Sequence, residues 1–399
     1  MPNFVFISPH FPDTYWKFCI SLRNHGFIVL GIGDAPYNEI GDACKFSLNE
    51  YFCCAKMEDY ENEKMAVKYY IDKYGPITFL ESNNEYWLTK DAQLRTEFHI
   101  TSGVDIEGVK LFRSKIRQKE IFEKNGIKCA RFTADNSRDG IFAFAKKVGF
   151  PIFAKPDDGV GAQGTMKIKN EEDVNNFISV RDQNKKYIIE EFVEGDIISF
   201  DGVANSHSDV IFCTEDVFTV NNADIVNNDL DDMYYCNPYM DHEFYELGCK
   251  VVKAARIQQR FFHIEFFVLT KDHPYLGKKG TRIPLEINCR PAGGYTPDVI
   301  NFANSLSCYD IYADCLAFDE NRQNMNQEKF YCVACSRRFK SKYVHEFSEV
   351  LDKFKYAICM YGDYPEVLRD DMGDCYAIAK FKTMDELYEF DRFVREKIK

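Results

Sequence analysis

No apolar run in this chain reaches the length of about 20 residues that a membrane-spanning helix needs. The first residues, MPNFVFISPH, lack the basic start and the long apolar segment of a secretory signal. Basic residues are in deficit, because 50 Lys and Arg face 63 Asp and Glu and give a formal net charge of −13. Nucleic-acid-binding surfaces are basic. We therefore expect a cytoplasmic protein that binds neither membranes nor nucleic acid.

Paired cysteines with the spacing of metal ligands are also scarce, although the chain has 15 cysteines. Cys332 and Cys335 form a C-x-x-C in a strand-like run, where residues three apart point to opposite faces. No second pair accompanies them. We predict reduced thiols in the core of a cytosolic protein, without a redox motif or a zinc site.

The N-terminal third alternates strand and helix patterns. NFVFIS, FIVLGIG and ITFLES are short apolar runs separated by helix-like segments, a rhythm that predicts a parallel sheet. The first turn, SPHFPD, has no glycine, so a dinucleotide site is not expected there. The stretch from Glu215 to His242 is acidic, rich in Asn and Asp and weakly periodic, which favours an excursion or lid. From about residue 319, new strand and helix patterns indicate a separate α+β cap.

A glycine-rich loop, KPDDGVGAQGT, contains Gly159, Gly161 and Gly164 in a G-x-G-x-x-G pattern. A Rossmann turn needs a helix directly after the third glycine, but TMKIK alternates like a strand. The loop therefore joins two strands. Such a hairpin can cover phosphates with its backbone N–H groups, and Lys155 lies at the end of the entering strand. The alternative is a surface hairpin with a solvated lysine.

Acidic residues on apolar strands follow downstream. YIIEEFVEG contains Glu190 and Glu191, and Glu265 lies within FFHIEFFVL. RIPLEINCRP contains Glu286 and Asn288, which point to one face of a strand. Carboxylate and amide oxygens in such places suit Mg²⁺ that bridges nucleotide phosphates. The alternatives are a buried salt bridge to Arg290 and ordinary edge-strand charges. A zinc deaminase motif around Glu265 is rejected, since no P-C-x-x-C partner exists.

These motifs together resemble the ATP-grasp superfamily, in its carboxylate–amine ligase-like branch with biotin carboxylase, D-alanine ligase and phosphoribosylglycinamide synthetase type enzymes. The resemblance rests on SNNEYWLTKDAQLR, a lysine-bearing helix, FAKPDDGVGAQGT, IIEEFVEGDIISFDG, HIEFFV and LEINCRPAGG, and covers about residues 1–320. It implies an α/β and α+β fold in which ATP lies between two α+β subdomains behind a parallel-sheet domain. It also implies ATP and Mg²⁺, with Mn²⁺ as an alternative ion, and small-molecule carboxylate and amine substrates. The resemblance is also compatible with a homodimer.

The resemblance implies a role for each matching residue. Lys115 and Lys155 would bind the ATP phosphates, with Lys119 as the rival of Lys115, and Arg290 would steady the reacting anion as a catalytic residue beside Lys155. The implied nucleotide contacts are Gly159, Gly161, Gly164, Glu190, Glu191 and Val193, and the implied metal ligands are Glu265, Glu286 and Asn288. The family often has a ribose-binding acid where this chain has Ile197, so neighbouring Asp196 is the candidate substitute.

The predicted domains are 1–112 (parallel-sheet domain), 113–195 (small ATP-grasp subdomain with the glycine loop), 196–318 (central subdomain with the metal site) and 319–399 (C-terminal α+β cap). The predicted activity is ATP-dependent joining of a carboxylate to an amine through an acyl phosphate. A phosphoryl transferase, a carboxylase-like enzyme and a nucleotide-binding regulatory protein are the alternatives.

The substrate is expected near RPAGGYTPD and the 215–242 stretch. There Gly293 and Gly294 allow close approach of the backbone, and Thr296 and Pro297 favour a helix start. A plain strand–turn–helix connection is the alternative. In the cap, Arg337 and Arg338 are expected to be a solvated pair at a strand end, without a catalytic role.

Overall fold

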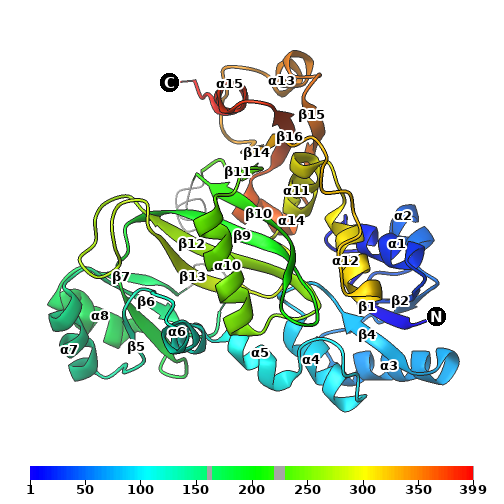
Figure 1. The fold of residues 1–399 in the computed structure, drawn as a ribbon, viewed down its shortest axis with the longest axis horizontal. Helices are drawn as coiled ribbons and strands as arrows, with labels where there is room; N and C mark the ends of the chain where they lie inside the picture. The colour runs from blue at the N-terminus through cyan, green and yellow to red at the C-terminus, as the bar shows by residue number, and fades with distance from the viewer. Residues whose placement is uncertain (160–163, 220–229, 399) are drawn as a thin grey trace.

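The computed structural model describes residues 1–159, 164–219 and 230–398. Gly161 and part of the 215–242 stretch lie outside these residues. Figure 1 shows the parallel sheet at one side, a small antiparallel sheet at the other, and a large sheet between them. Among the described residues, no helix is long and apolar enough to span a membrane.

The first sheet is parallel, as predicted, with strand order β3-β2-β1-β4. Its strands are β1 (Asn3–Ile7), β2 (Ile28–Gly33), β3 (Glu50–Cys53) and β4 (Ile77–Glu81). The helices of this region are α1 (Trp16–Asn24), α2 (Asp42–Ser47), α3 (Tyr60–Tyr74), α4 (Leu88–Glu97) and α5 (Ile106–Arg113).

The second sheet is antiparallel, with strand order β5-β8-β6-β7. Its strands are β5 (Phe132–Thr133), β6 (Ile152–Pro156), β7 (Met166–Ile168) and β8 (Tyr187–Glu191). Helices α6 (Lys115–Lys124), α7 (Arg138–Val148) and α8 (Glu171–Val180) belong to the same part of the chain. Because β6 and β7 pair directly, the glycine loop joins two strands, as predicted from TMKIK.

The third sheet has eight strands in the order β13-β12-β9-β10-β11-β14-β16-β15. They are β9 (Gly195–Ala204), β10 (Val210–Phe218), β11 (Met233–Asn237), β12 (Arg260–Leu269), β13 (Arg282–Asn288), β14 (Tyr331–Arg337), β15 (Ile358–Asp363) and β16 (Cys375–Phe381). Its helices are α10 (His242–Ala255), α11 (Thr296–Asn304), α12 (Cys308–Phe318), α13 (Phe347–Lys353), α14 (Glu366–Met372) and α15 (Met384–Arg395).

One expectation about this sheet needs correction, and another stays a prediction. In the 215–242 stretch, residues 215–218 and 233–237 belong to the paired strands β10 and β11, and the predicted excursion or lid lies partly outside the described residues. The C-terminal strands do not form a separate sheet, because β14 pairs with β11 and extends the central one. The unpaired edge of β11 provides the backbone groups for this addition. The division into four domains stays a proposal, with its last boundary inside one continuous sheet.

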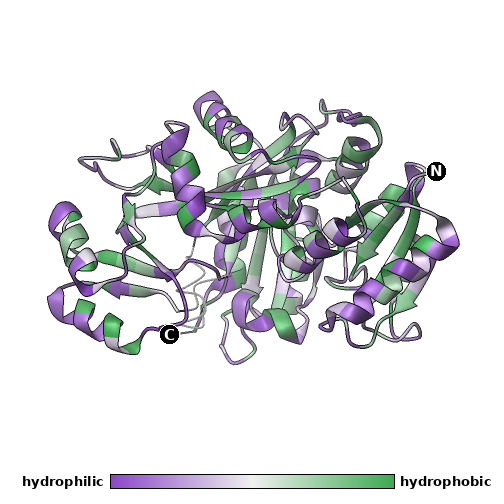
Figure 2. Ribbon diagram, turned by 90° about the horizontal axis from the view of Figure 1, so that it is seen from below, coloured by the Kyte–Doolittle hydropathy of each residue, from purple (hydrophilic) through white to green (hydrophobic). Residues whose placement is uncertain are grey.

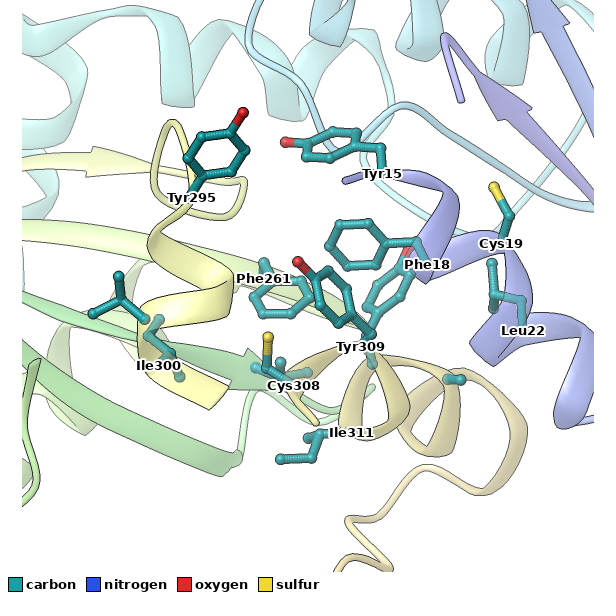
Figure 3. Packing of buried hydrophobic residues seen from close by; sticks show 14 of the residues in the cluster. Tyr15, Phe18, Cys19, Leu22, Phe261, Tyr295, Ile300, Cys308, Tyr309 and Ile311 are labelled. Carbon is teal, nitrogen blue, oxygen red and sulfur yellow. The ribbon is translucent and has the colours of Figure 1, made fainter. Parts of the chain in front are cut away.

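Alternation along the strands separates the two faces of the third sheet. Figure 2 shows apolar residues along the strands of the sheets and polar stretches along the helices. One face carries Ile198, Phe200, Ile264 and Phe266, which pack with α10. The opposite face contributes to the largest apolar cluster, and in Figure 3 Phe18 of α1 lies beside Tyr309 of α12 and Phe261 of β12. Cys332 and Cys335 fall into different clusters, so the prediction that they face opposite ways is confirmed.

A buried ion pair fixes the parallel sheet to the third sheet. Glu81, the last residue of β4, lies 3.0 Å from Arg260 of β12 and 3.3 Å from Arg95 of α4. All three side chains are buried, so each charge depends on its partners. The loop that follows β4 is therefore held close to β12 and β13, where the predicted metal ligands lie.

Candidate active site

The predicted metal ligands lie together on one face of the third sheet. The register of β12 and β13 pairs Glu265 with Glu286 and His263 with Asn288. Paired residues of antiparallel strands point to the same face, so all four side chains share one surface. The residues between them, Ile264 and Ile287, face the apolar cluster under α10. The strands therefore present oxygen ligands on one side and bury apolar side chains on the other.

Two carboxylates and one amide form this oxygen set. No group of three or more His, Cys, Asp or Glu side chains arranged to hold a metal occurs in the described parts of the chain. Mg²⁺ in nucleotide sites takes few protein ligands and fills its other positions with phosphate oxygens and water. The chemistry of Glu265, Glu286 and Asn288 therefore fits a nucleotide-bound Mg²⁺ and not a metal held by protein ligands alone.

Lys115 connects the glycine loop to this surface. Its helix α6 is capped by Ser114, whose hydroxyl donates to Asp157 directly after β6. Lys115 Nζ donates to the carbonyl of Gly159 over 2.9 Å and lies 3.0 Å from Glu286 Oε1. The first lysine of α6 thus joins the described start of the glycine loop to one predicted metal ligand.

Glu190 lies between two lysines. Its carboxylate is 3.0 Å from Lys119 Nζ and 2.8 Å from Lys155 Nζ, and the Glu190 side chain is almost fully buried. Burial alone favours the neutral carboxyl, but the two ammonium groups lower the pKa of Glu190 to about 2. Burial likewise opposes the charge of Lys155, whose pKa is nevertheless raised by the carboxylates of Glu190, Glu286 and Glu265. The contact of the Glu190 side chain with adenine stays a prediction, and in this structure its carboxylate contacts the two lysines.

Glu191 points away from this cluster. Its carboxylate accepts hydrogen bonds from the backbone N–H and the guanidinium of Arg131, with distances of 2.7 Å to the backbone nitrogen and 2.8 Å to Nε. Val193 is buried in an apolar cluster that includes Leu276 and Ile283, against which Phe267 packs. Phe267 lies two residues beyond Glu265 and shares its face. Val193 and Phe267 thus belong to the same apolar cluster, and an apolar surface of this kind suits a flat aromatic base.

Asp196 is not brought to the same surface. In the register of β9 and β12, Ser199 lies opposite Glu265 and Asp196 lies opposite Val268. By alternation, Asp196 points to the face opposite Glu265, and its side chain is exposed. The substitution of Asp196 for a ribose-binding acid is therefore not supported. Of the three loop glycines, Gly159 and Gly164 are described, and Gly164 has a φ of 73° that favours glycine.

Arg290 has Glu85 as a partner. Arg290 Nε lies 3.5 Å from Glu85 Oε2, and Arg113 approaches the other oxygen of Glu85 to 3.6 Å. Arg113 also donates to Asp158 over 2.8 and 3.0 Å, at the start of the glycine loop. Sequence reasoning did not assign Glu85, Arg113 or Asp158. The signal was present, since Glu85 belongs to SNNEYW and Asp158 to KPDDG, but only the fold shows that they meet.

His263 joins two carboxylates on the same face. Its Nδ1 lies 2.7 Å from Asp201 Oδ1, and its Nε2 lies 3.4 Å from Glu265 Oε1. Burial alone lowers the pKa of His263, but the two carboxylates raise it to about 10. In turn, burial disfavours the charge of Glu265, while His263, Arg290 and Lys155 lower its pKa. Glu265 is therefore held as a carboxylate.

The turn before α11 is more tightly packed than predicted. Gly294 has a φ of 60°, and a Cβ built there would lie 2.3 Å from Met372 Cε of α14. Tyr295 stacks on Tyr364 with 5.5 Å between ring centroids. Asp298, in the first turn of α11, is paired with Lys17 over 2.6 Å. These contacts favour the alternative of a packed strand–turn–helix connection, while the substrate assignment stays a proposal.

The expected solvation of Arg337 and Arg338 is wrong, because both side chains are buried. Arg337 donates to the carbonyls of Val394 and His345, and Arg338 donates to those of Leu230, Arg369 and Asp370. Loop and helix-end carbonyls are strong acceptors that apolar neighbours cannot satisfy. The two arginines thus hold the C-terminal segments together, and no catalytic role is indicated.

A family model described as the carbamoyl-phosphate synthase L chain, ATP-binding domain, matches residues 114–224. N5-carboxyaminoimidazole ribonucleotide synthase from Aquifex aeolicus is 25% identical over 212 residues, which cover 49% of this chain and 52% of that protein. The match thus spans about half the length of this curated relative.

The fold is similar to that of solved enzymes over almost the whole chain. An L-amino acid ligase from Bacillus licheniformis has a TM-score of 0.69 at 14% identity, covering 98% of this chain and 96% of that chain. The chain has the ATP-grasp fold. Its resemblance to the ATP-grasp superfamily is therefore confirmed, and the relatives agree with the predicted ligase class.

A second similar structure contains a bound nucleotide. It is the biotin carboxylase domain dimer of 2-oxoglutarate carboxylase from Hydrogenobacter thermophilus, in complex with MgADP, ADP and bicarbonate. Its TM-score is 0.67 at 15% identity, and the alignment covers 95% of this chain and 86% of that chain.

Proposed function

We propose that the chain is an ATP-dependent ligase that activates a carboxylate as an acyl phosphate and joins it to an amine or a similar nucleophile, releasing ADP and phosphate. The observation that carries the proposal is the meeting of Glu265 and Glu286, paired across β12 and β13, with Lys115 and Lys155. Acidic oxygens for a metal and lysines for phosphates are the groups that phosphoryl transfer requires.

In the first step, an oxygen of the substrate carboxylate attacks the γ-phosphorus of ATP, and the bond to the β,γ-bridging oxygen breaks. Lys115 and Lys155 bind phosphate oxygens and offset their charge. Mg²⁺, held by Glu265, Glu286 and Asn288, supplies further charge neutralisation when it is bound. ADP leaves, and the acyl phosphate remains.

In the second step, the nitrogen of the amine attacks the acyl carbon, phosphate leaves with the bonding electron pair, and the nitrogen loses a proton. Arg290 is the proposed group that steadies the anion. A guanidinium matches the geometry of carboxylate and phosphate oxygens. Glu85, on the loop after β4, would share Arg290 with the substrate, so the parallel-sheet domain borders the proposed substrate site.

In the proposed site, the adenine of ATP lies in the region of Val193 and Phe267. The phosphates of ATP lie at the glycine loop with Gly159 and Gly164. Closure of such a loop would keep water from the acyl phosphate. A cytoplasmic location, a homodimer and small-molecule acid and amine substrates belong to the same proposal. The dimeric state of the Hydrogenobacter structure supports only the proposed homodimer, by analogy.

Hydroxylamine trapping tests the reaction without knowledge of the amine. The full chain is incubated with ATP, MgCl₂, hydroxylamine and a panel of carboxylic and amino acids, and hydroxamate and ADP are measured together. Equal amounts of both products with at least one acid support acyl phosphate chemistry. ATP binding without hydroxamate or ADP across the panel would instead favour a nucleotide-binding regulatory protein. ADP release with phosphorylated product and no hydroxamate would favour a phosphoryl transferase.

A further inference from the structure

Behind the proposed metal ligands lies a short chain of buried polar side chains. Asp201, His263 and Glu265 are joined through the imidazole, with distances of 2.7 Å at Nδ1 and 3.4 Å at Nε2. Asp201 and His263 are 2% and 6% exposed, so solvent does not stabilise their charges. The steps of the proposed reaction use Glu265 and make no use of His263 or Asp201.

The register of β9 and β12 produces this arrangement. Asp201 pairs with His263, and Ser199 pairs with Glu265, so all four side chains point to one face. The Ser199 hydroxyl donates to Asp201 Oδ2, which fixes the carboxylate. The ring of Phe218 meets the imidazole edge-on, with 6.2 Å between centroids. The imidazole therefore has a defined orientation, with one nitrogen at each carboxylate.

A purely structural role for such a pair is the main alternative. Buried ion pairs often contribute little to stability compared with apolar residues of similar size, so they need another reason to be present. The chain offers a matched comparison in His25, whose Nε2 lies 3.0 Å from Asp314 Oδ1 between α1 and α12. His25 contacts none of the proposed site residues, whereas His263 contacts Glu265.

We propose that His263 is a positioning residue that holds Glu265 by Oε1, so that Oε2 stays directed to the metal bound with the nucleotide. Asp201 supports this role because it accepts from Nδ1 and fixes the ring. The inference rests on the proposed function, in which Glu265 is a metal ligand. Groups that orient metal ligands typically change metal affinity by about 10–100-fold when they are removed.

Mn²⁺ and ADP allow a test that needs no acid substrate and no turnover. Mn²⁺ binding to the full chain in the presence of saturating ADP is measured by electron paramagnetic resonance, and ADP binding in EDTA is measured by calorimetry. His263→Asn retains an amide near the Nδ1 site but cannot reach Glu265. His263→Gln places an amide nitrogen near the Nε2 site and can reach it. His25→Gln is the matched control.

We expect His263→Asn to weaken Mn²⁺ binding in the ADP complex by about 10–100-fold. ADP affinity in EDTA should stay unchanged, and His263→Gln should recover part of the loss. His25→Gln should leave Mn²⁺ binding unchanged. If His263→Asn does not fold, Asp201→Asn replaces it, with a smaller loss expected because the ring remains.

Two results would overturn the inference in different ways. Wild-type Mn²⁺ affinity in the ADP complexes of His263→Asn and Asp201→Asn would show that Glu265 needs no positioning, while the proposed site stands. Absence of ADP-dependent Mn²⁺ binding in the wild-type chain would remove the metal site itself, and the positioning role with it.

Discussion

Replacement of Glu190 by Gln should destabilise the small antiparallel sheet at neutral pH. Glu190 lies between the ammonium groups of Lys119 and Lys155, at 3.0 and 2.8 Å. Glutamine keeps the size of the side chain and removes its charge, which leaves two lysines without their shared counterion. Breaking a buried ion pair by removing one partner costs about 3–5 kcal/mol.

The pKa of Glu190 gives the same magnitude by another route. The lysines lower this pKa from 4.5 to about 2, against the effect of burial. That difference corresponds to about 3 kcal/mol of stability. Because the folded-state pKa is the lower one, this stability is fully present above about pH 4.5 and is lost as the pH falls towards 2. The difference between wild type and Glu190→Gln should therefore be constant from pH 7 to about pH 5 and shrink below it.

Hydrogen exchange followed by mass spectrometry is the appropriate assay. The two tryptophans, Trp16 and Trp87, lie in the parallel-sheet region and report poorly on the second sheet. Peptides that cover β6 and β8 should exchange about 100-fold faster in Glu190→Gln at pH 7, since 1.4 kcal/mol is a factor of ten. Glu194→Gln is the control, because Glu194 pairs with Lys271 on the surface and such pairs contribute at most about 1 kcal/mol.

Unchanged exchange of β6 and β8 in Glu190→Gln at pH 7 would refute the reasoning. A difference that grows between pH 5 and pH 3 would refute it too, because it would mean that Glu190 is not held as a buried carboxylate.

Three further outcomes follow from the site and from the C-terminal contacts. Lys155→Ala should raise the ATP concentration needed for half-maximal ADP release by about tenfold or more, since Lys155 is a proposed phosphate ligand. Glu286→Gln should lower turnover by about 100-fold or more and abolish its response to added Mg²⁺, while EDTA should abolish turnover of the wild type. Arg338→Ala should lower the free energy of unfolding by about 2 kcal/mol or more, because hydrogen bonds from a charged donor to three backbone carbonyls are lost. Its KM for ATP should not change, and an increase confined to the KM of the acid would contradict the structural role.

Periodicity predicted the local features of the fold correctly. The alternation in TMKIK distinguished a hairpin from a Rossmann turn, and β6 and β7 do pair. Likewise, the spacing of Glu286 and Asn288 predicted one shared face. Alternation depends only on neighbouring residues along the chain, so it can be read without knowledge of the fold.

Contacts between distant segments could not be predicted in the same way. The hinge pattern YIIEE predicts a role of Glu190 at adenine, but it gives no sign that the carboxylate contacts lysines from α6 and β6. Which residue lies opposite which depends on strand register, and that is set by packing over the whole sheet. Arg337 and Arg338 were misjudged for a related reason. Their partners are backbone carbonyls, which have no signature in the sequence.

The choice between Lys115 and Lys119 as the first phosphate lysine illustrates how the structure adds to such patterns. Residues four apart lie on the same side of a helix, so α6 directs both side chains to the site. Lys119 is 1% exposed and is paired with Glu190, so its charge already balances a buried carboxylate. Lys115 is partly exposed and contacts Gly159 and Glu286, which belong to the proposed phosphate loop and metal site. An incoming phosphate can therefore engage Lys115 without leaving a buried carboxylate unpaired, and we propose Lys115 as the phosphate ligand and Lys119 as the counterion of Glu190.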